Sequence, residues 1–568
     1  MNPPSEVSAA SPVAYFSMEV ALDDDLPTFS GGLGVLAGDV LRSAADLAEP
    51  VVAVSVCWRD GYFHQLIDDE GRQLEEPVRW CPAAVLERLE ARVRVEIAGR
   101  SVVVGCWRRV LVGVTGGEVP VYFLDTDVEE NSDADRAITD QLYGGDNAHR
   151  LAQEIVLGVG GPAMLDALGI APGAFHMNEG HSSLLTLALY EEELAADGTA
   201  APAAAQAVRA RCVFTTHTPV AAGHDVFPAA LVADLLGATR AAELERLGLL
   251  EGDELNMTEL GMRHSHYVNG VSLRHQVVAQ ELAPGHRVES VTNGVHLATW
   301  AAPQFAALFD RHVPDWRVDN ALLRYVGGVP TEEIAEAHRE AKQALFTEVA
   351  ARYGHRLDPE ALTIGLARRA TPYKQTTLLF SDPERLRSVA KAGGPLQVLC
   401  AGKAHPRDAE GHELIERIVA AGGLLEGDVE VHFLPDYGLE MAKRLCAGTD
   451  LWLNNPIKPY EASGTSGMKA AVNGVPSLST LDGWWIEGCF EGVTGWAIGG
   501  LGDGDDASDL YAALEERVLP CFYGDQQCYL EVMRSSIALN ASFFHTERVV
   551  REYARSAYRE RGTGGRDD

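Results

Sequence analysis

Short apolar segments recur along the chain, and each is followed by a polar or glycine-rich turn and then by a stretch of helical character. The segments are rich in Val, Leu, Ile and Phe and do not alternate with polar residues, which is typical of strands buried on both faces of a parallel sheet. We predict strands at Val13–Ser17, Val51–Trp58, Val119–Asp125, Ala174–Asn178 and Val213–Thr216, and in the second half at Leu362–Ala367, Leu396–Gly402, Val429–Pro435, Leu451–Asn454 and Val475–Ser479.

The segments between these strands carry the periodicity of helices. In Thr331–Tyr353 most charged residues lie off an apolar stripe, which predicts an amphipathic helix; the stripe consists of Ile334, Ala337, Ala341, Leu345 and Val349. Strands about 30 residues apart with helices between them indicate βαβ units. We therefore predict an α/β fold with two doubly wound, Rossmann-like domains that meet near Val291–Pro303 and face each other across a cleft. Ligands of such sheets bind beyond the carboxyl ends of the strands.

The composition narrows the possible ligands. The 568 residues include 47 Lys and Arg against 82 Asp and Glu, a net charge of −35. Such a surface repels nucleic acids and anionic membranes, which excludes a general nucleic-acid binder. An anionic substrate would need a local basic pocket. No apolar run approaches the roughly 18 residues of a membrane span, so we expect no membrane association.

Cysteine usage and the N-terminus indicate a cytoplasmic protein. The nine cysteines form no CxxC pair, which favours buried free thiols in a reducing compartment. Met1–Pro12 lacks the basic and apolar regions of a signal peptide.

Two motifs suit an anion. In Ser30–Gly34 adjacent glycines would let backbone N–H groups approach a phosphate, and Gly38 with Asp39 follows closely. The alternative is a tight turn needed for helix packing. Arg368–Lys374 places three cations directly after a predicted strand, where Arg forks match phosphate oxygens. The alternative here is a solvated helix face.

A third motif, Glu461–Lys469, also follows a predicted strand. Its small residues, two glycines and three hydroxyls precede a helical start, which would make an anion cradle. Lys469 would lie just inside that helix on an apolar face. Burial lowers the pKa of a lysine, and a neutral amine can form a Schiff base. A surface lysine remains the alternative at this point.

His and Asn residues gather in and after strands, at His176–His181, Thr216–Pro219 and Thr292–His296. Polar groups around a cleft suit a hydroxyl-rich ligand such as a sugar, although capping and core hydrogen bonds would explain them as well. No HExxH or comparable ligand spacing is present, so we expect no metal site.

Together these motifs resemble one family, the α-glucan phosphorylases, which act on glycogen, starch or maltodextrin and use pyridoxal phosphate. The resemblance runs in order from residue 14 to about 490 and rests on SGGLGVLAGD (30–39), HMNEGHS (176–182), THTP (216–219), VTNGV (291–295) with Trp300, RRATPYK (368–374) and EASGTSGMKAAVNG (461–474). The string EASGTSGMK is the most specific, because the glycine loop alone is also similar to that of glycogen synthases.

The resemblance implies a role for each matching residue. Lys469 would carry pyridoxal phosphate, and the cofactor would also be bound by Gly464, Thr465, Ser466, Arg368 and Trp300. Substrate phosphate would meet Arg369, Lys374, Gly31 and Gly32. The sugar side of the cleft would include Asn178, His181, His217, Asn293, Tyr373 and Glu461. The catalytic set would be Arg369, Lys374, His217, Glu461 and Lys469.

The implied reaction is reversible, retaining phosphorolysis of α-1,4-linked glucan to α-glucose 1-phosphate, with the cofactor phosphate relaying a proton to inorganic phosphate. Two phosphoryl dianions a few ångström apart require cations between them, and water must be kept out so that phosphate is the acceptor. The implied fold is GT-B, with domains at 1–295 and 296–540 and a helix within about 540–568, from Asn540 to Tyr558, crossing back to the first. Members of this family are commonly dimers, so a homodimer is one possibility that the resemblance implies, and the sequence itself leaves the oligomeric state open.

The chain departs from larger, regulated relatives. Ser30 replaces Asn, Thr371 replaces His, Pro219–Gly223 differs, and no aspartate-bearing gate loop is recognisable. Phosphorylation control and nucleotide activation are therefore not expected, and chain-length preference stays open. Two other functions also stay open: a sugar-nucleotide-dependent GT-B glycosyltransferase resembling glycogen synthase, and a non-catalytic glucan-binding protein.

Overall fold

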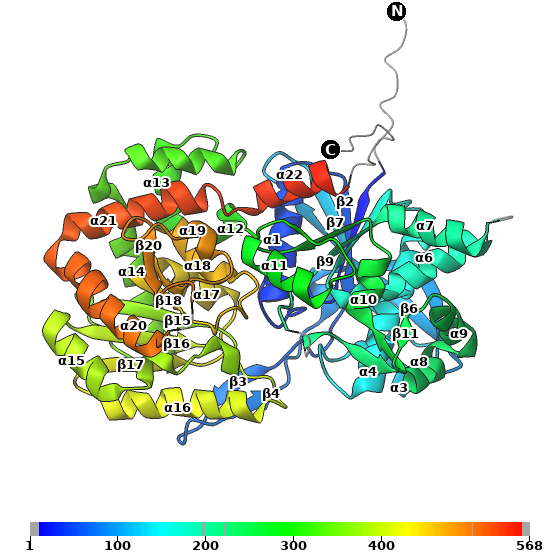
Figure 1. The fold of residues 1–568 in the computed structure, drawn as a ribbon, viewed down its shortest axis with the longest axis horizontal. Helices are drawn as coiled ribbons and strands as arrows, with labels where there is room; N and C mark the ends of the chain where they lie inside the picture. Colours follow the sequence, from blue (N-terminus) through cyan, green and yellow to red (C-terminus); the bar gives the residue numbers. More distant parts are fainter. Residues whose placement is uncertain (1–10, 196–198, 221–222, 503, 559–568) are drawn as a thin grey trace, which may run out of the picture.

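Two large β-sheets, each with its own helices, organise the chain (Figure 1). The structure is a computed structural model that describes residues 11–195, 199–220, 223–502 and 504–558. Residues 1–10 of the predicted N-terminal segment, residues 221–222 and residues 559–568 lie outside the described part.

The first sheet combines a parallel centre with an antiparallel edge. In the described chain its order is β14-β13-β9-β8-β1-β2-β7-β6-β5, and only the pairs β7–β6 and β6–β5 run antiparallel. Its strands are β1 (Val13–Ser17), β2 (Val51–Val56), β5 (Glu87–Ile97), β6 (Arg100–Val112), β7 (Glu118–Asp125), β8 (Ala174–Asn178), β9 (Cys212–Thr215), β13 (Tyr267–Gly270) and β14 (Glu289–Ser290).

The second sheet is parallel throughout its described strands, in the order β17-β16-β15-β18-β19-β20. Apolar side chains bury most of both faces, as expected for a sheet between helices. Its strands are β15 (Leu362–Ala367), β16 (Leu396–Ala401), β17 (Val429–Leu434), β18 (Leu451–Asn454), β19 (Ser477–Thr480) and β20 (Gly495–Ile498).

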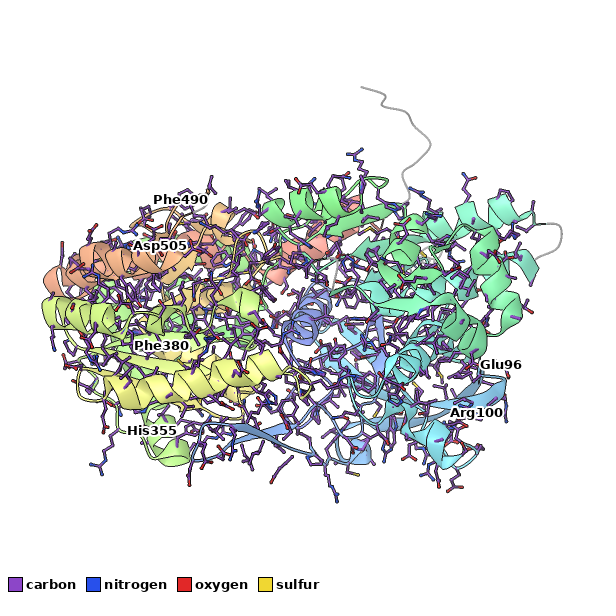
Figure 2. All side chains as sticks on the ribbon, turned by 60° about the horizontal axis from the view of Figure 1, so that its bottom comes forward. Glu96, Arg100, His355, Phe380, Phe490 and Asp505 are labelled. Atoms are coloured by element: carbon purple, nitrogen blue, oxygen red, sulfur yellow. The ribbon has the colours of Figure 1, made fainter. Side chains whose placement is uncertain are left out.

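The predicted parallel α/β fold is confirmed, but the strands toward the sheet edges were missed: β5, β6, β13 and β14 in the first sheet and β20 in the second. Every predicted strand is present within two residues of its predicted bounds, and α14 (Thr331–Tyr353) has the predicted ends. However, β5 and β6 form a long antiparallel pair that the apolar pattern missed. The reason is that β5 is a partly exposed edge strand rich in Glu and Arg, and such a strand lacks the apolar run of a buried one. Figure 2 shows Glu96 and Arg100, near the turn of this pair, at the opposite end of the molecule from Phe380.

Two segments tie the sheets together. The last helix, α22 (Thr546–Ser556), lies against α1 (Gly32–Asp46), where the Thr546 and Ser43 hydroxyls are 2.7 Å apart (Figure 1). It begins later than the predicted helix, because residues 540–541 end a π-helix (Ser536–Ala541) and residues 542–545 form a turn that pairs His545 with Val295. The hairpin of β3 (His64–Ile67) and β4 (Gln73–Glu76) reaches the other sheet: the Gln65 and Gln73 amides donate to the carbonyls of Gly402 and Ala404 at 2.9 Å.

The described residues show the predicted free thiols. All nine cysteines are unpaired, and six of them are buried. Over the described ranges, no helix combines the length and apolarity that crossing a membrane requires.

A buried ion pair fastens α14 to the second sheet. Lys342 Nζ donates to Asp450 Oδ2 at 2.7 Å and to the Ala361 carbonyl at 3.0 Å. His338 Nε2 lies 2.9 Å from Asp450 Oδ1, and the Thr363 N–H donates to Asp450 Oδ2. Burial opposes the charge of Asp450, but Lys342 and His338 outweigh it and lower the pKa of this carboxyl.

We expect Lys342→Ala to lower the free energy of unfolding by about 3 kcal/mol, because it strands the buried Asp450 carboxylate. Urea unfolding followed by tryptophan fluorescence measures this. The control is Lys391→Ala, whose exposed ion pair with Asp428 contributes roughly 0–1 kcal/mol. Equal stability of the two variants would contradict the assignment.

Candidate active site

A cavity of about 710 Å³ lies between the two sheets, and segments that follow the strands of both sheets line it. The wall from the first sheet includes the loops after β1, β8 and β9. The wall from the second includes the loops after β15, β16 and β18. These are the carboxyl ends of parallel strands, where ligands of such sheets bind. The cavity is therefore the candidate active site.

Lys469 occupies the buried floor of this cavity. It lies in α18 (Thr465–Val472), whose N-cap Gly464 has a left-handed φ of 85°. Within the described residues no side chain caps the first turn of α18, so its N–H groups remain available to an anion. Lys469 Nζ lies 4.2 Å from the centre of the Trp300 ring. Burial lowers the pKa of Lys469, and nearby Asp39 offsets part of that effect.

Asp39 links this floor to the first sheet. The indole N–H of Trp300 donates to Asp39 Oδ2 at 2.8 Å. Asp39 lies in α1, directly after Gly38, where a Cβ atom would come within 2.0 Å of the Ala21 carbonyl oxygen. The Gly-Asp pair thus allows close backbone packing and anchors the ring that faces Lys469. Burial raises the pKa of Asp39, and Lys469 limits the rise.

Three cations follow β15 into the same cavity. Arg368 donates to the carbonyls of Lys374 and Leu453 and to Asn455 Oδ1 at 2.7–3.0 Å, and burial lowers the pKa of its guanidinium to about 10. Lys374 is paired with Glu461, and both side chains are almost fully buried. Arg369 lines the cavity, with no ion pair to any described residue.

The glycine loop meets Arg369 from the opposite side of the cavity. A Cβ atom on Gly31 would lie 3.8 Å from Arg369 Nε. However, the N–H groups of Ser30 and Gly31 donate to Glu19 Oε2 at 2.6 and 3.1 Å, and the Tyr143 hydroxyl donates to Glu19 Oε1 at 2.8 Å. One buried carboxylate therefore fixes both the glycine loop and Tyr143. The sequence analysis missed Glu19, because a single Glu after a strand carries no motif.

His217 and Asn178 form a polar pair at the ends of β9 and β8. His217 Nε2 lies 2.6 Å from Asn178 Oδ1, and since an amide oxygen only accepts, this nitrogen carries the proton. The backbone N–H of His217 donates to Glu179 Oε2 at 2.7 Å. Burial, and next the neighbouring His275, lowers the pKa of His217 to about 3, so the ring is neutral. Asn178 lies behind His217 and fixes the tautomer in which Nε2 of the His217 ring carries the proton.

A buried charge cluster lies beside His181. Arg150 Nη2 donates to Asp225 Oδ2 at 2.9 Å, and His181 Nε2 lies 3.4 Å from the same oxygen. Burial opposes the charge of Asp225, but Arg150 and His181 lower its pKa to about 2. Burial, and next the adjacent Asp225, raises the pKa of Glu154 well above its ordinary value. The sequence analysis had included only His181 of these residues.

The structure brings the predicted site residues together. The cavity is lined by Gly31, Gly32, His181, His217, Asn293, Trp300, Arg368, Arg369, Tyr373, Lys374, Glu461, Gly464, Thr465, Ser466 and Lys469. The remaining predicted residue, Asn178, is buried behind His217 rather than in the wall. For Lys469 and Arg368–Lys374, the surface alternatives do not hold. For Gly34 and Gly38, close packing explains the glycines.

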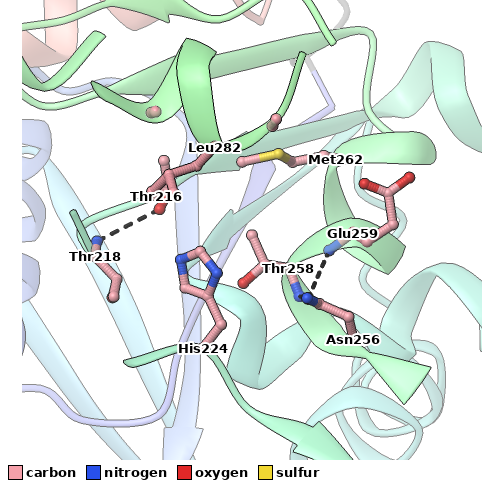
Figure 3. Close-up of a pocket in the computed structure, with 10 residues that line it drawn as sticks. Thr216, Thr218, His224, Asn256, Thr258, Glu259, Met262 and Leu282 are labelled. Atoms are coloured by element: carbon pink, nitrogen blue, oxygen red, sulfur yellow. Dashed lines mark hydrogen bonds between the residues drawn. The ribbon is translucent and has the colours of Figure 1, made fainter. Parts of the chain in front are cut away.

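A second cavity of about 60 Å³ adjoins the loop after β9 (Figure 3). Thr216, Thr218 and Thr258 surround the ring of His224 in this view, and the Thr218 N–H donates to Thr216 Oγ1 at 3.4 Å. Such a volume holds a few water molecules and is far too small for a sugar ring. The larger cavity therefore remains the candidate active site.

Comparison with known proteins agrees with this geometry. A sequence model of the family described as carbohydrate phosphorylase matches residues 229–491. The chain is 38% identical to the maltodextrin phosphorylase of Thermococcus litoralis and 37% identical to the glycogen phosphorylase of Mycobacterium tuberculosis, over 96% of this chain and 70% of each relative. It is 34% identical to the glycogen phosphorylase of Aquifex aeolicus, over 96% of this chain and 86% of the relative. This chain therefore belongs to the α-glucan phosphorylase family.

Proposed function

We propose that this chain catalyses reversible, retaining phosphorolysis of α-1,4-linked glucan to α-glucose 1-phosphate, and that it does so with pyridoxal phosphate held at Lys469. The observation that carries the proposal is the convergence of Lys469, Arg369 and Lys374 with the His217 wall in one cavity. The names of the relatives, glycogen phosphorylase and maltodextrin phosphorylase, support the same reaction. We also propose that the two sheets are the two Rossmann-like lobes of a GT-B enzyme.

The residues around Lys469 fit pyridoxal phosphate. The amine is buried, has no ion pair with any described residue, and has a lowered pKa, which favours the neutral form that attacks an aldehyde. The uncapped first turn of α18 offers N–H donors to a phosphate group. Arg368 would add a positive charge nearby. When bound, pyridoxal phosphate would supply a phosphate group that exchanges a proton with inorganic phosphate.

Arg369 and Lys374 would hold inorganic phosphate. Both line the cavity, and a cation in such a recess gains more from a dianion than one on the open surface, since less water screens it. Glu461 holds Lys374 in place through Oε2, and its other carboxylate oxygen would accept hydrogen bonds from sugar hydroxyls. The Arg369 fork matches two phosphate oxygens, and the Glu19 carboxylate keeps the glycine loop next to it.

The opposite wall would bind the glucosyl unit. His217 is neutral and its Nε2–H is taken by Asn178, so its Nδ1 is left to accept a hydrogen bond from a sugar hydroxyl. Asn293 and Tyr373 line the same cavity. Bound glucan and phosphate would have to fill this polar cavity and displace bulk water, which would otherwise compete with phosphate for the anomeric carbon.

Lys469→Ala tests the cofactor assignment. We expect purified wild-type protein, supplied with pyridoxal phosphate, to retain it through gel filtration and to show its visible or near-ultraviolet absorbance. The variant lacks the amine, so it should lose this absorbance and about a thousandfold or more of the phosphorolysis rate. Lys391→Ala, on the exposed side of α15 (Pro383–Gly393), is the control and should behave as wild type. Retention of the cofactor by Lys469→Ala would overturn the assignment.

Arg369→Lys tests the phosphate site. A lysine keeps the charge but not the planar fork, so we expect the KM for phosphate to rise by about tenfold or more while the KM for glucan changes little. Initial rates with maltodextrin or glycogen at varied phosphate concentration measure both constants. Arg385→Lys, whose partner is Glu515 near the surface, should leave both unchanged. Glucosyl transfer from a sugar nucleotide by wild type, without phosphate dependence, would instead favour a glycogen-synthase-like enzyme.

A further inference from the structure

The turn between β19 and α19 (Trp485–Gly488) packs directly behind the cavity wall. The Trp484 N–H donates to the Ser463 carbonyl at 2.9 Å. Gly483 has a left-handed φ of 53°, and a Cβ atom there would lie 2.5 Å from the Ser463 carbonyl oxygen and 3.1 Å from Glu461 Cγ. The turn therefore touches the segment Glu461–Ser463 with no space for a side chain between them.

The Asp482 carboxylate closes this contact. Its Oδ2 accepts the Glu461 N–H at 2.8 Å, and its Oδ1 accepts the Gly483 N–H at 2.9 Å. Asp482 is 2% exposed. One side chain thus joins the backbone of the turn to the backbone of the residue whose carboxylate is paired with Lys374 in the cavity.

Little in the surroundings compensates the charge of Asp482. No ion pair to it is formed within the described residues, and the charged groups that act on it are Glu461 and, from α11 (Leu273–Leu282), Arg274. Burial is the main cause that raises the pKa of Asp482 to about 6. This pKa lies above the ordinary aspartate pKa of roughly 4, so between about pH 4 and pH 6 the native state holds a proton that the unfolded chain has released. Ionisation of the buried carboxyl at higher pH therefore lowers the free energy of unfolding.

We propose that Asp482 is a positioning residue that fixes the backbone at Glu461 and so sets the place of the Glu461–Lys374 pair in the cavity. This inference rests on the proposed function, since the pair is argued to hold phosphate and sugar. Asp482 touches neither ligand. It acts by accepting two backbone N–H groups, and a protonated carboxyl loses part of that capacity because one of its oxygens becomes a donor.

The consequence is an activity that depends on the protonation of Asp482. As pH falls through about 6, the carboxyl takes up its proton, an N–H of Glu461 or Gly483 loses its acceptor, and the Glu461 segment loosens. We expect kcat/KM for phosphorolysis to fall on this acid limb. At higher pH the carboxylate is ionised and the segment is held.

Asp482→Asn in the holoenzyme tests the inference. The amide has the same shape but turns an NH₂ group toward one backbone N–H, so we expect kcat/KM at about pH 7.5 to fall about tenfold. The part of the acid limb that belongs to Asp482 should disappear, as seen by comparing wild-type and variant profiles of kcat and KM from about pH 5 to 8. Asp382→Asn, which caps α15 through the Arg385 N–H at the surface, is the matched control and should keep the wild-type values and profile.

Gly483→Ala separates the position of the Glu461 backbone from the titration of the Asp482 carboxyl. It also tests the inference if Asp482→Asn does not fold. Its methyl group displaces Ser463 and Glu461 but leaves the carboxyl intact, so kcat/KM should fall at every pH while the acid limb stays. An unchanged kcat/KM in Gly483→Ala, or a wild-type profile in Asp482→Asn, would overturn the inference. A wild-type holoenzyme that does not phosphorolyse glucan would overturn the proposed function itself.

Discussion

The burial of positive charge is the constraint on which the structure depends. A chain with a net charge of −35 places Arg368, Arg369, Lys374 and Lys469 in one cavity, where burial opposes the charged forms of Arg368 and Lys469. Carbonyl oxygens compensate Arg368, and Glu461 compensates Lys374. Arg369 and Lys469 lack comparable partners among the described residues, and an incoming anion is the partner that physical chemistry offers them. The chemistry of the site follows from this incomplete compensation.

The cavity exists only because two sheets meet, and several contacts keep them in register. Asp39, in α1 beside the first sheet, accepts a hydrogen bond from Trp300, whose ring lies against Lys469 in α18 beside the second sheet. The glycine loop reaches Arg369 across the cavity. Farther from the cavity, α22 packs against α1, and the hairpin of β3 and β4 hydrogen-bonds to the loop after β16. Each of these contacts joins residues distant in sequence, so the charge arrangement is a property of the whole chain.

The sequence predicted the parts of the fold and the site that carry strong local patterns. Most buried parallel strands appear as apolar runs, and α14 appears as an amphipathic stripe, so these were predicted within two residues of their bounds. The short parallel strands β13 and β20 were missed, because their four residues include glycine and form no long apolar run. Motifs at strand ends identified Lys469 and Arg369, because cations beside buried strands are rare in an acidic chain. The edge strand β5 was missed, because its exposed face carries charges. Glu19 and Asp482 were missed for another reason: each acts by accepting backbone N–H groups of a distant segment, and no local pattern reveals such a contact.

The central claim is that Lys469 holds pyridoxal phosphate in the cavity that Arg368 and Arg369 line. Its most direct test is reduction of the cofactor-loaded wild-type protein with borohydride, followed by proteolysis and mass spectrometry of the peptides. The account predicts a phosphopyridoxyl group on Lys469 in close to one copy per chain. An unmodified Lys469, or a label spread over exposed lysines, would contradict it.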